Sequence, residues 1–279
     1  MKISLVLATL GSRHDEIIRL LESLDNQSYK NFELIVVDQN EDDALRNLLL
    51  LYNDKFKWQY VKSEKGLSLS RNNGLKYVSG DIICFPDDDC WFNEQVLQRV
   101  VNTFQNNSSF DGLTGGCFEP DGSGNIAKFD SENGYVDFYS VWTKAVSCTI
   151  FLKKNVLDTV GGFDTNLGVG AKTPFKSGEE TDLMIRVIKS EFTVFYDSEL
   201  IVYHPNPIIE YDARTYGRAY TYGCGFGQVL KKHSYPLMFV LKCLIRPMGG
   251  SILNLITFNT SKAKYHLNVF KGRVYGYTH

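Results

Sequence analysis

The sequence predicts an α/β domain with a mixed, mostly parallel sheet flanked by helices, followed by a helical extension. Short apolar runs alternate with segments of helical spacing over the first hundred residues, a pattern typical of a parallel sheet covered on both faces. From Ala213 onward the chain carries apolar and basic residues without a single acid. We therefore expect one domain over residues 1–210 and a basic amphipathic helical extension over residues 211–279.

The expected elements follow from hydrophobic spacing. Ile17, Leu20, Leu21 and Leu24, for example, recur at the spacing of one helix face. Helices are expected over 15–24, 44–51, 67–77, 96–104 and 179–188. Strands are expected over 3–8, 32–37, 58–61, 81–85, 146–152, 193–196 and 200–203. Residues 112–139 are rich in Gly, Asp and Asn, so we expect them to be less regular.

Composition narrows the cellular setting. The six cysteines are scattered without CxxC spacing, which favours reduced thiols in a cytoplasmic protein over a disulfide framework or a zinc site. Lys2 precedes only a short apolar run, so no signal peptide is expected. No stretch of eighteen uncharged apolar residues occurs, and we expect no clean transmembrane helix.

Three consecutive aspartates, Asp87, Asp88 and Asp89, follow the apolar run of residues 82–86. The carboxyl edge of such a strand is where α/β proteins bind ligands. Crowded carboxylates repel each other unless a positive charge lies between them, and Mg²⁺ typically uses one or two carboxylates together with substrate phosphates. A solvated acidic turn or a helix N-cap is the structural alternative.

Read in order, the polar residues at the strand ends resemble the motifs of family 2 glycosyltransferases of the GT-A fold, which is Rossmann-like. The resemblance covers roughly residues 1–204. It rests on residues 3–9, 33–38, 65–66, 70–74, 81–89, 161–164 and 178–183. Two departures concern base recognition: the first strand ends Ala8-Thr9-Leu10-Gly11, and Gln39 follows Asp38 where a second acid is common.

The resemblance implies roles for single residues. Donor-binding residues would be Thr9 and Asp38 at the nucleotide base, Arg71 near the nucleotide, and Asp87 and Asp88 of the acidic triplet. It places Asp87 at the ribose and Asp89 at a Mn²⁺ or Mg²⁺ ion. His204 would be a second metal ligand, although a lone histidine is more often structural.

The family's general base usually lies in a Glu-Asp pair, and Glu180 occupies that position in Glu179-Glu180-Thr181-Asp182. Because Glu180 replaces an aspartate, Asp182 remains a rival for the same role. An acceptor hydroxyl needs such a base on the face of the sugar opposite the leaving group. The alternative is that these acids are simply favoured at a helix N-terminus.

Charge sets the C-terminal extension apart. Residues 213–279 contain ten of the chain's 30 Lys and Arg, which leaves 20 bases against 32 acids, a net charge of −12, in residues 1–212. The broken apolar run from Tyr235 to Phe258 suits a helix pair lying in the interface of an anionic membrane. A bundle packing on the rest of the chain or on a second subunit, giving a homodimer, is the alternative. Nucleic-acid binding is disfavoured by the acidic remainder.

The leading interpretation is a metal-dependent inverting glycosyltransferase that uses a nucleotide-sugar, with a UDP-sugar expected first. The resemblance implies a saccharide or lipid-linked oligosaccharide acceptor in surface-polysaccharide synthesis. The protein would then be cytoplasmic and peripheral on the inner face of the cell membrane. The alternatives are a sugar-phosphate nucleotidyltransferase, for which residues 10–13 make a poor phosphate loop, and a non-catalytic carbohydrate-binding or scaffold protein.

Overall fold

The computed structural model describes residues 1–119, 130–205 and 210–279. The chain divides into two compact units. The sheet unit comprises Met1–Phe163 and Leu183–Asn206, and the helical unit comprises Asp164–Asp182 and Pro207–His279. Residues 164–182 thus belong with the C-terminal helices, whereas the boundary expected at residue 210 places them in the first domain.

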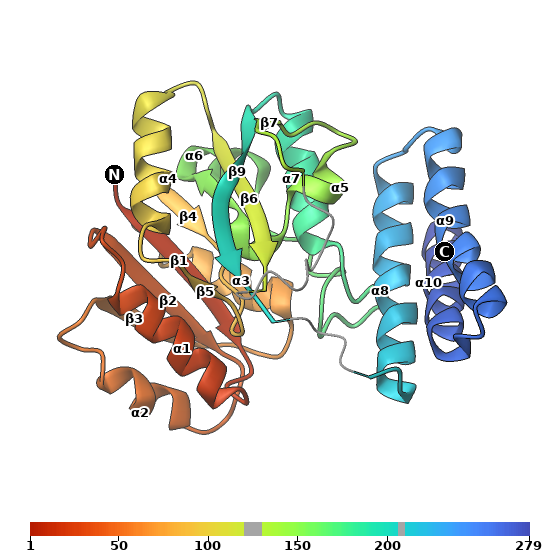
Figure 1. Ribbon diagram of the computed structural model, residues 1–279. Helices are drawn as coiled ribbons and strands as arrows, with labels where there is room; N and C mark the ends of the chain where they lie inside the picture. The colour runs from red at the N-terminus through yellow and green to blue at the C-terminus, as the bar shows by residue number, and fades with distance from the viewer. Residues whose placement is uncertain (120–129, 206–209) are drawn as a thin grey trace. The chain divides into compact units, whose positions relative to one another are not determined.

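A mixed sheet forms the centre of the sheet unit, as predicted (Figure 1). Its first four strands are mutually parallel, in the order β3 (Lys57–Lys62), β2 (Phe32–Asp38), β1 (Ile3–Thr9), β4 (Ile82–Cys84). The sheet continues through β8 (Phe151–Lys153), β6 (Gly112–Phe118), β9 (Val194–Tyr203) and β5 (Trp91–Phe92), and β7 (Gly134–Tyr135) pairs with β9. The pairing of β6 with β9 is parallel, and β8, β5 and β7 join antiparallel.

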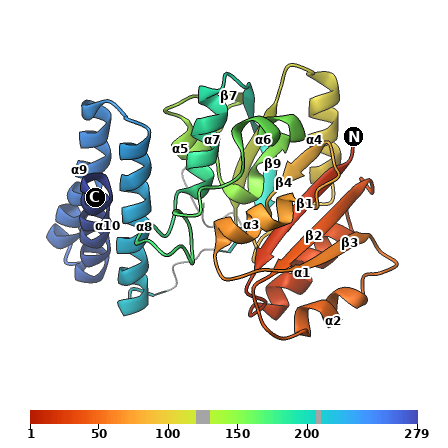
Figure 2. The same cartoon turned by 180° about the vertical axis from the view of Figure 1, so that it is seen from behind.

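Helices cover both faces of this sheet because the strand side chains alternate between them. The odd-numbered residues of β1, such as Leu5 and Leu7, share a buried core with α1 (His14–Asp25) and α4 (Val96–Asn106). The even-numbered Val6 lies against Gly74 of α3 (Leu67–Leu75) on the opposite face. Comparison of Figures 1 and 2 shows α1 and α3 on opposite sides of the sheet. The remaining helices are α2 (Ala44–Leu50), α5 (Val141–Lys144), η1 (Ser147–Thr149), α6 (Lys154–Val160) and α7 (Glu179–Lys189).

Three expected elements differ from the structure. The stretch expected to be irregular begins with the buried strand β6, whose glycines are used for close packing: a Cβ on Gly115 would lie 2.0 Å from the carbonyl oxygen of Leu200. The strand expected over 146–152 is a 3₁₀ turn, η1, followed by the short β8. The two strands expected at 193–203 are one strand, β9, which passes a register shift opposite Thr114 and Gly116.

The helical unit contains α8 (Ala213–Lys232), α9 (Leu237–Ile256) and α10 (Thr260–Thr278). Helices α8 and α10 pack backbone to backbone: a Cβ on Gly276 would lie 1.9 Å from the carbonyl oxygen of Cys224. Small residues on two helices permit this close approach, as in tightly packed helix pairs generally.

The helix pair expected between Tyr235 and Phe258 is instead one continuous helix, α9. Pro247 lies inside it and removes the hydrogen bond to the carbonyl four residues earlier. That carbonyl, of Cys243, accepts from Arg273 Nη1 at 2.6 Å, which explains why the helix continues. With 20 residues and a mean hydropathy of 1.4, α9 is long and apolar enough to cross a bilayer. No clean transmembrane helix was expected because the sequence has no uncharged apolar stretch of eighteen residues; α9 meets the test of length and composition although it contains Lys242 and Arg246.

Candidate functional site

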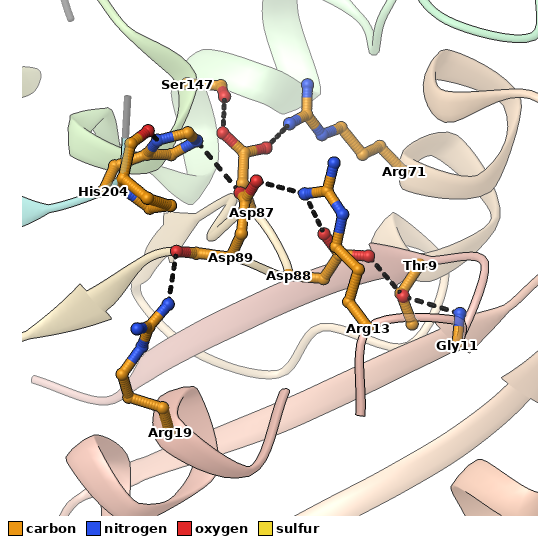
Figure 3. A network of polar contacts seen from close by, with 11 residues as sticks. Thr9, Gly11, Arg13, Arg19, Arg71, Asp87, Asp88, Asp89, Ser147 and His204 are labelled. Atoms are coloured by element: carbon orange, nitrogen blue, oxygen red, sulfur yellow. Dashed lines mark hydrogen bonds and ion pairs between the residues drawn. The ribbon is translucent and has the colours of Figure 1, made fainter. Parts of the chain in front are cut away.

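The acidic triplet lies just beyond β4, at the carboxyl edge of the parallel strands, where it meets side chains from four other segments (Figure 3). Arg71 comes from α3 and Ser147 from η1, while Thr9 ends β1 and His204 follows β9. Six of the expected site residues, including the middle aspartate of the triplet, Asp88, therefore converge on one edge of the sheet unit.

Asp87 is held by the most buried arginine of the protein. The Asp87 Oδ1 atom accepts from Arg71 Nη2 at 2.8 Å, and its Oδ2 atom accepts from Ser147 Oγ at 2.9 Å. The Arg71 side chain is 1% exposed, and its guanidinium carbon lies 5.2 Å from the ring centre of Phe163. Burial raises the pKa of Asp87 to about 7, against the opposing effect of Arg71.

Asp88 and Asp89 share a second arginine. Asp88 accepts from Thr9 Oγ1 at 2.6 Å and from Arg13 Nη1 at 3.1 Å, and the same Arg13 atom also binds Asp89. Thr9 itself accepts from the backbone N–H of Gly11 at 2.8 Å. Burial raises the pKa of Asp88. Sequence reasoning did not single out Arg13 for the site.

His204 completes the cluster as an imidazolium. Its Nε2 atom lies 2.9 Å from Asp89 Oδ1, and its Nδ1 atom lies 2.6 Å from the carbonyl oxygen of Pro205. Since both oxygens are acceptors, both ring nitrogens must carry protons. Burial lowers the pKa of His204, but the hydrogen bond and charge of Asp89 outweigh it and raise the pKa to about 9.

The donor set fits a hard divalent cation shared with a ligand. Across residues 1–119, 130–205 and 210–279 no group of three His, Cys, Asp or Glu side chains is arranged to hold a metal alone. Mg²⁺ keeps several waters and takes one or two carboxylates beside substrate phosphates, so a carboxylate such as Asp89 suits a cation site that a bound diphosphate would complete. Binding a cation through His204 Nε2 would release the proton from that nitrogen.

The His204–Asp89 pair leads to a pH prediction for the cation-free protein. His204 titrates near pH 9 in the fold against 6.5 unfolded, so its stabilising effect is fully present below pH 6.5 and is lost as the pH rises through about 9. His204→Gln, which donates a hydrogen bond but carries no charge, should therefore lower the free energy of unfolding at pH 6 by on the order of 1–3 kcal/mol. Thermal unfolding with chelator at pH 6 and pH 9.5 checks this. An equal loss at both pH values would contradict it.

Asp38 belongs to a neighbouring group of side chains. Its carboxylate is fully buried and accepts from Tyr60 Oη at 2.6 Å, Lys62 Nζ at 3.1 Å and the backbone N–H of Asn40 at 2.9 Å. Asp38 is the register partner of both Thr9 and Lys62, which places it beside the triplet's edge of the sheet. Alternation along β3 puts Tyr60 and Lys62 on one face, a signal that sequence reasoning overlooked.

The two candidate bases lie on the first turn of α7, in the helical unit, in unlike surroundings. Glu180 is partly exposed, and its carboxylate has no hydrogen bond or ion pair with any residue that the structure describes. It lies near the phenol of Tyr222. Burial raises the pKa of that phenol, and the negative charges of Glu179 and Glu180 raise it further. Asp182 is fully buried and accepts from Lys232 Nζ at 2.7 Å and His233 Nε2 at 2.9 Å.

Solved structures with the same fold are glycosyltransferases. The structure of Staphylococcus aureus TarS 1–349 in complex with UDP-GlcNAc matches with a TM-score of 0.63 and 18% identity, covering 97% of this chain and 90% of TarS 1–349. The mannosyltransferase PcManGT from Pyrobaculum calidifontis, in complex with GDP-Man and Mn²⁺, matches with a TM-score of 0.64 and 14% identity, covering 98% and 87%. At these identities the likeness establishes the GT-A fold.

Sequence relatives lead to the same group of proteins. The glucosyl-dolichyl phosphate glucuronosyltransferase of Haloferax volcanii is 28% identical over 60% of this chain and 58% of its own length. The Escherichia coli UDP-Glc:alpha-D-GlcNAc-diphosphoundecaprenol beta-1,3-glucosyltransferase WfgD is 32% identical over 39% of this chain and 43% of its own length. The chain thus spans about half the length of these curated relatives. The profile of glycosyl transferase family 2 matches residues 4–157, more than half of the chain, and the protein belongs to that family.

Proposed function

We propose that this protein transfers a sugar from a nucleotide-sugar to a hydroxyl of a saccharide acceptor, with inversion at the transferred carbon. The observation that carries the proposal is the cluster of Asp87, Asp88 and Asp89 with Arg71, Arg13 and His204 at the carboxyl edge of the sheet. Carboxylates for a cation and guanidinium groups for phosphate oxygens are together there, as a diphosphate leaving group requires.

The donor would bind along the same edge. Thr9 and Asp38 are register partners on adjacent strands, so a base lying across the ends of β1 and β2 would meet both. The donor we expect first is a UDP-sugar, since TarS 1–349 is described in complex with UDP-GlcNAc and with UDP. Arg71, fixed by Asp87 and packed against aromatic rings, would stabilise charge on the departing diphosphate.

Asp89 and His204 would hold the divalent cation, Mn²⁺ or Mg²⁺. When bound there, such a cation acts as a Lewis acid that stabilises the negative charge gained by the leaving diphosphate. Asp88, which accepts hydrogen bonds from Thr9 and Arg13, would contact the nucleotide-sugar donor and not the cation. PcManGT, described with GDP-Man and Mn²⁺, is a structural relative that supports a divalent cation.

Glu180 would take the proton from the acceptor hydroxyl. It lies on the first turn of α7, is partly exposed, and makes no ion pair with the described residues. A helix N-terminus favours its ionised form. The acceptor we propose is a saccharide, and a lipid-linked one in surface-polysaccharide synthesis is supported by relatives such as WfgD, named for a diphosphoundecaprenol-linked acceptor.

The direct test is a panel of nucleotide-sugars incubated with the full chain and Mn²⁺ or Mg²⁺. Release of nucleoside diphosphate, together with a rise in melting temperature on binding, should single out one nucleotide and one sugar. Release of inorganic pyrophosphate from a nucleoside triphosphate and a sugar phosphate would instead favour a nucleotidyltransferase. Binding of saccharides without any turnover would favour a carbohydrate-binding protein.

Helix α9 supports a place on the cytoplasmic face of an anionic membrane. Its outward side chains are apolar and exposed, with Leu237 64%, Ile245 52% and Ile252 53% exposed. Lys242 and Arg246 are exposed on the same helix, and the helical unit has no acid from residue 213 onward. A second copy of the chain would bring like charges together, whereas anionic lipid attracts each base by about 1 kcal/mol.

An interfacial position suits α9 better than a span. The helix packs along α10 through Ser251, which donates to the carbonyl oxygen of Ala263 at 2.9 Å, and α10 carries Lys262, Lys264 and Lys271. Drawing α9 across a bilayer would bring these charges toward the hydrocarbon core, at a cost of several kcal/mol. Lying flat, α9 can bury its apolar face while the bases stay at the headgroups.

We predict binding to anionic vesicles that weakens with salt without vanishing, and little binding to neutral vesicles. Ile245→Ser with Ile252→Ser should remove most of the binding, and Lys242→Gln with Arg246→Gln should reduce its salt dependence. Leu51→Ser and Lys57→Gln, at exposed positions of the sheet unit, are the matched controls. Co-sedimentation measures vesicle binding, and light scattering measures the oligomeric state. Unchanged vesicle binding, or a dimer that Ile245→Ser dissociates, would contradict the prediction.

A further inference from the structure

The fully buried Asp182 accepts hydrogen bonds from two residues at the C-terminal end of α8. Its Oδ1 atom accepts from both Lys232 Nζ and His233 Nε2, at 2.7 and 2.9 Å. Lys232 also binds Asp164 Oδ2 at 2.7 Å, so one ammonium group joins two carboxylates of the 164–182 segment. All four residues belong to the helical unit, and the bonds attach the first turn of α7 to the C-terminal end of α8.

The residues just before α7 are attached to the middle of α8. Ser177 Oγ donates to the carbonyl oxygen of Tyr222 at 2.8 Å. Gly178 has a φ of +88°, and a Cβ there would lie 2.9 Å from Val229. A Cβ on Gly225 would lie 2.2 Å from the carbonyl oxygen of Ser177. Glycine at both positions lets the two backbones touch.

These contacts bracket Glu180, which lies between Ser177–Gly178 on one side and Asp182 on the other. Glu180 itself is partly exposed, whereas Asp182 is fully buried with its Oδ1 atom taken by two donors. A general base must come within about 3 Å of the hydroxyl it deprotonates. Asp182 has no exposed surface, and a movement of its Oδ1 atom toward solvent would break its bonds to Lys232 and His233.

We infer that Asp182 is a positioning residue, and that its bonds to Lys232 and His233 clamp the first turn of α7 so that Glu180 meets the acceptor hydroxyl. This inference rests on the proposed transferase function and makes Glu180, not Asp182, the base. It also assigns α8, part of the segment expected to be an appendage, to the support of the reacting group.

The kinetic test compares pH profiles. Asp182→Asn and Lys232→Met should each lower kcat by about 10–100-fold, with the acid limb of kcat/KM at the same pH as in the wild type. Glu180→Gln should abolish that limb. Lys231→Met, at an exposed lysine next in sequence, is the matched control and should behave as the wild type. Loss of the limb in Asp182→Asn, or its movement to higher pH in Lys232→Met, would make Asp182 the base and overturn the inference.

A stability test is independent of the reaction. If Asp182 and Lys232 form one clamp, Asp182→Asn and Lys232→Met should each lower the melting temperature, and the double variant should lower it no further than the larger single change. Additive losses would refute the clamp. A wild-type protein that turns over no nucleotide-sugar would refute the proposed function instead, so the two failures are distinguishable.

Discussion

Glu180→Gln should lower the turnover number by roughly 10²–10⁴, the usual contribution of a general base, with little change in donor affinity. Gln keeps the size of the side chain but cannot accept the proton. Because Glu180 has no ion pair among the described residues, the substitution leaves no buried charge unpaired, and the melting temperature should stay close to that of the wild type. Single-turnover rates and titration with the nucleoside diphosphate measure the two effects separately.

Glu22→Gln, at an exposed position of α1, is the control for the loss of one negative charge. The pH profiles separate Glu180 from Asp182 as the base. A Glu180→Gln variant with wild-type turnover would show that the acceptor is deprotonated elsewhere.

Asp89→Ala should remove turnover almost entirely and abolish the cation dependence of nucleoside diphosphate binding. The carboxylate is the one that both His204 and Arg13 contact, so its loss removes the centre of the charge cluster. A Lewis acid at a leaving diphosphate is worth several kcal/mol, which corresponds to a rate loss of about 10²–10⁴ or more. Calorimetric titration with and without Mn²⁺ measures the binding, and product release measures the rate.

Asp54→Ala, which changes an exposed aspartate, controls for charge alone. The fold should survive Asp89→Ala because Arg13 is 46% exposed and can return to water. Full activity of the wild-type protein in excess chelator would refute a role for the cation, whatever the variant shows.

The sequence was informative wherever local pattern and burial agree. The apolar runs of β1, β2 and β4 are buried on both faces, so their composition alone predicts strands. The polar residues that follow them were expected to meet at one edge, and Thr9 and Asp88 do so. Family membership and the GT-A fold were also predicted correctly.

The features that the sequence did not predict depend on contacts between segments far apart along the chain. Arg13 and Ser147 join the cluster through bonds to Asp88 and Asp87, residues 75 and 60 positions away along the chain, and nothing in their own neighbourhoods marks them. Strand β6 was overlooked because its glycines resemble a loop until Leu200 packs on them. The helix α9 continues through Pro247 because Arg273, 30 residues from Cys243, bonds the carbonyl of Cys243.

The division of the chain has a consequence for the order of folding. Residues 164–182 belong to the same unit as the last 73 residues. The contacts that residues 164–182 make with α8 cannot form until α8 has been synthesised. The sheet unit ends its own sequence at residue 206 and can gather its strands earlier, since domains generally fold as units during synthesis. Nascent chains should therefore form the carboxyl edge of the sheet, with its acidic triplet, before the position of Glu180 is fixed. This order would keep an incomplete chain from transferring an activated sugar to water or to a wrong acceptor.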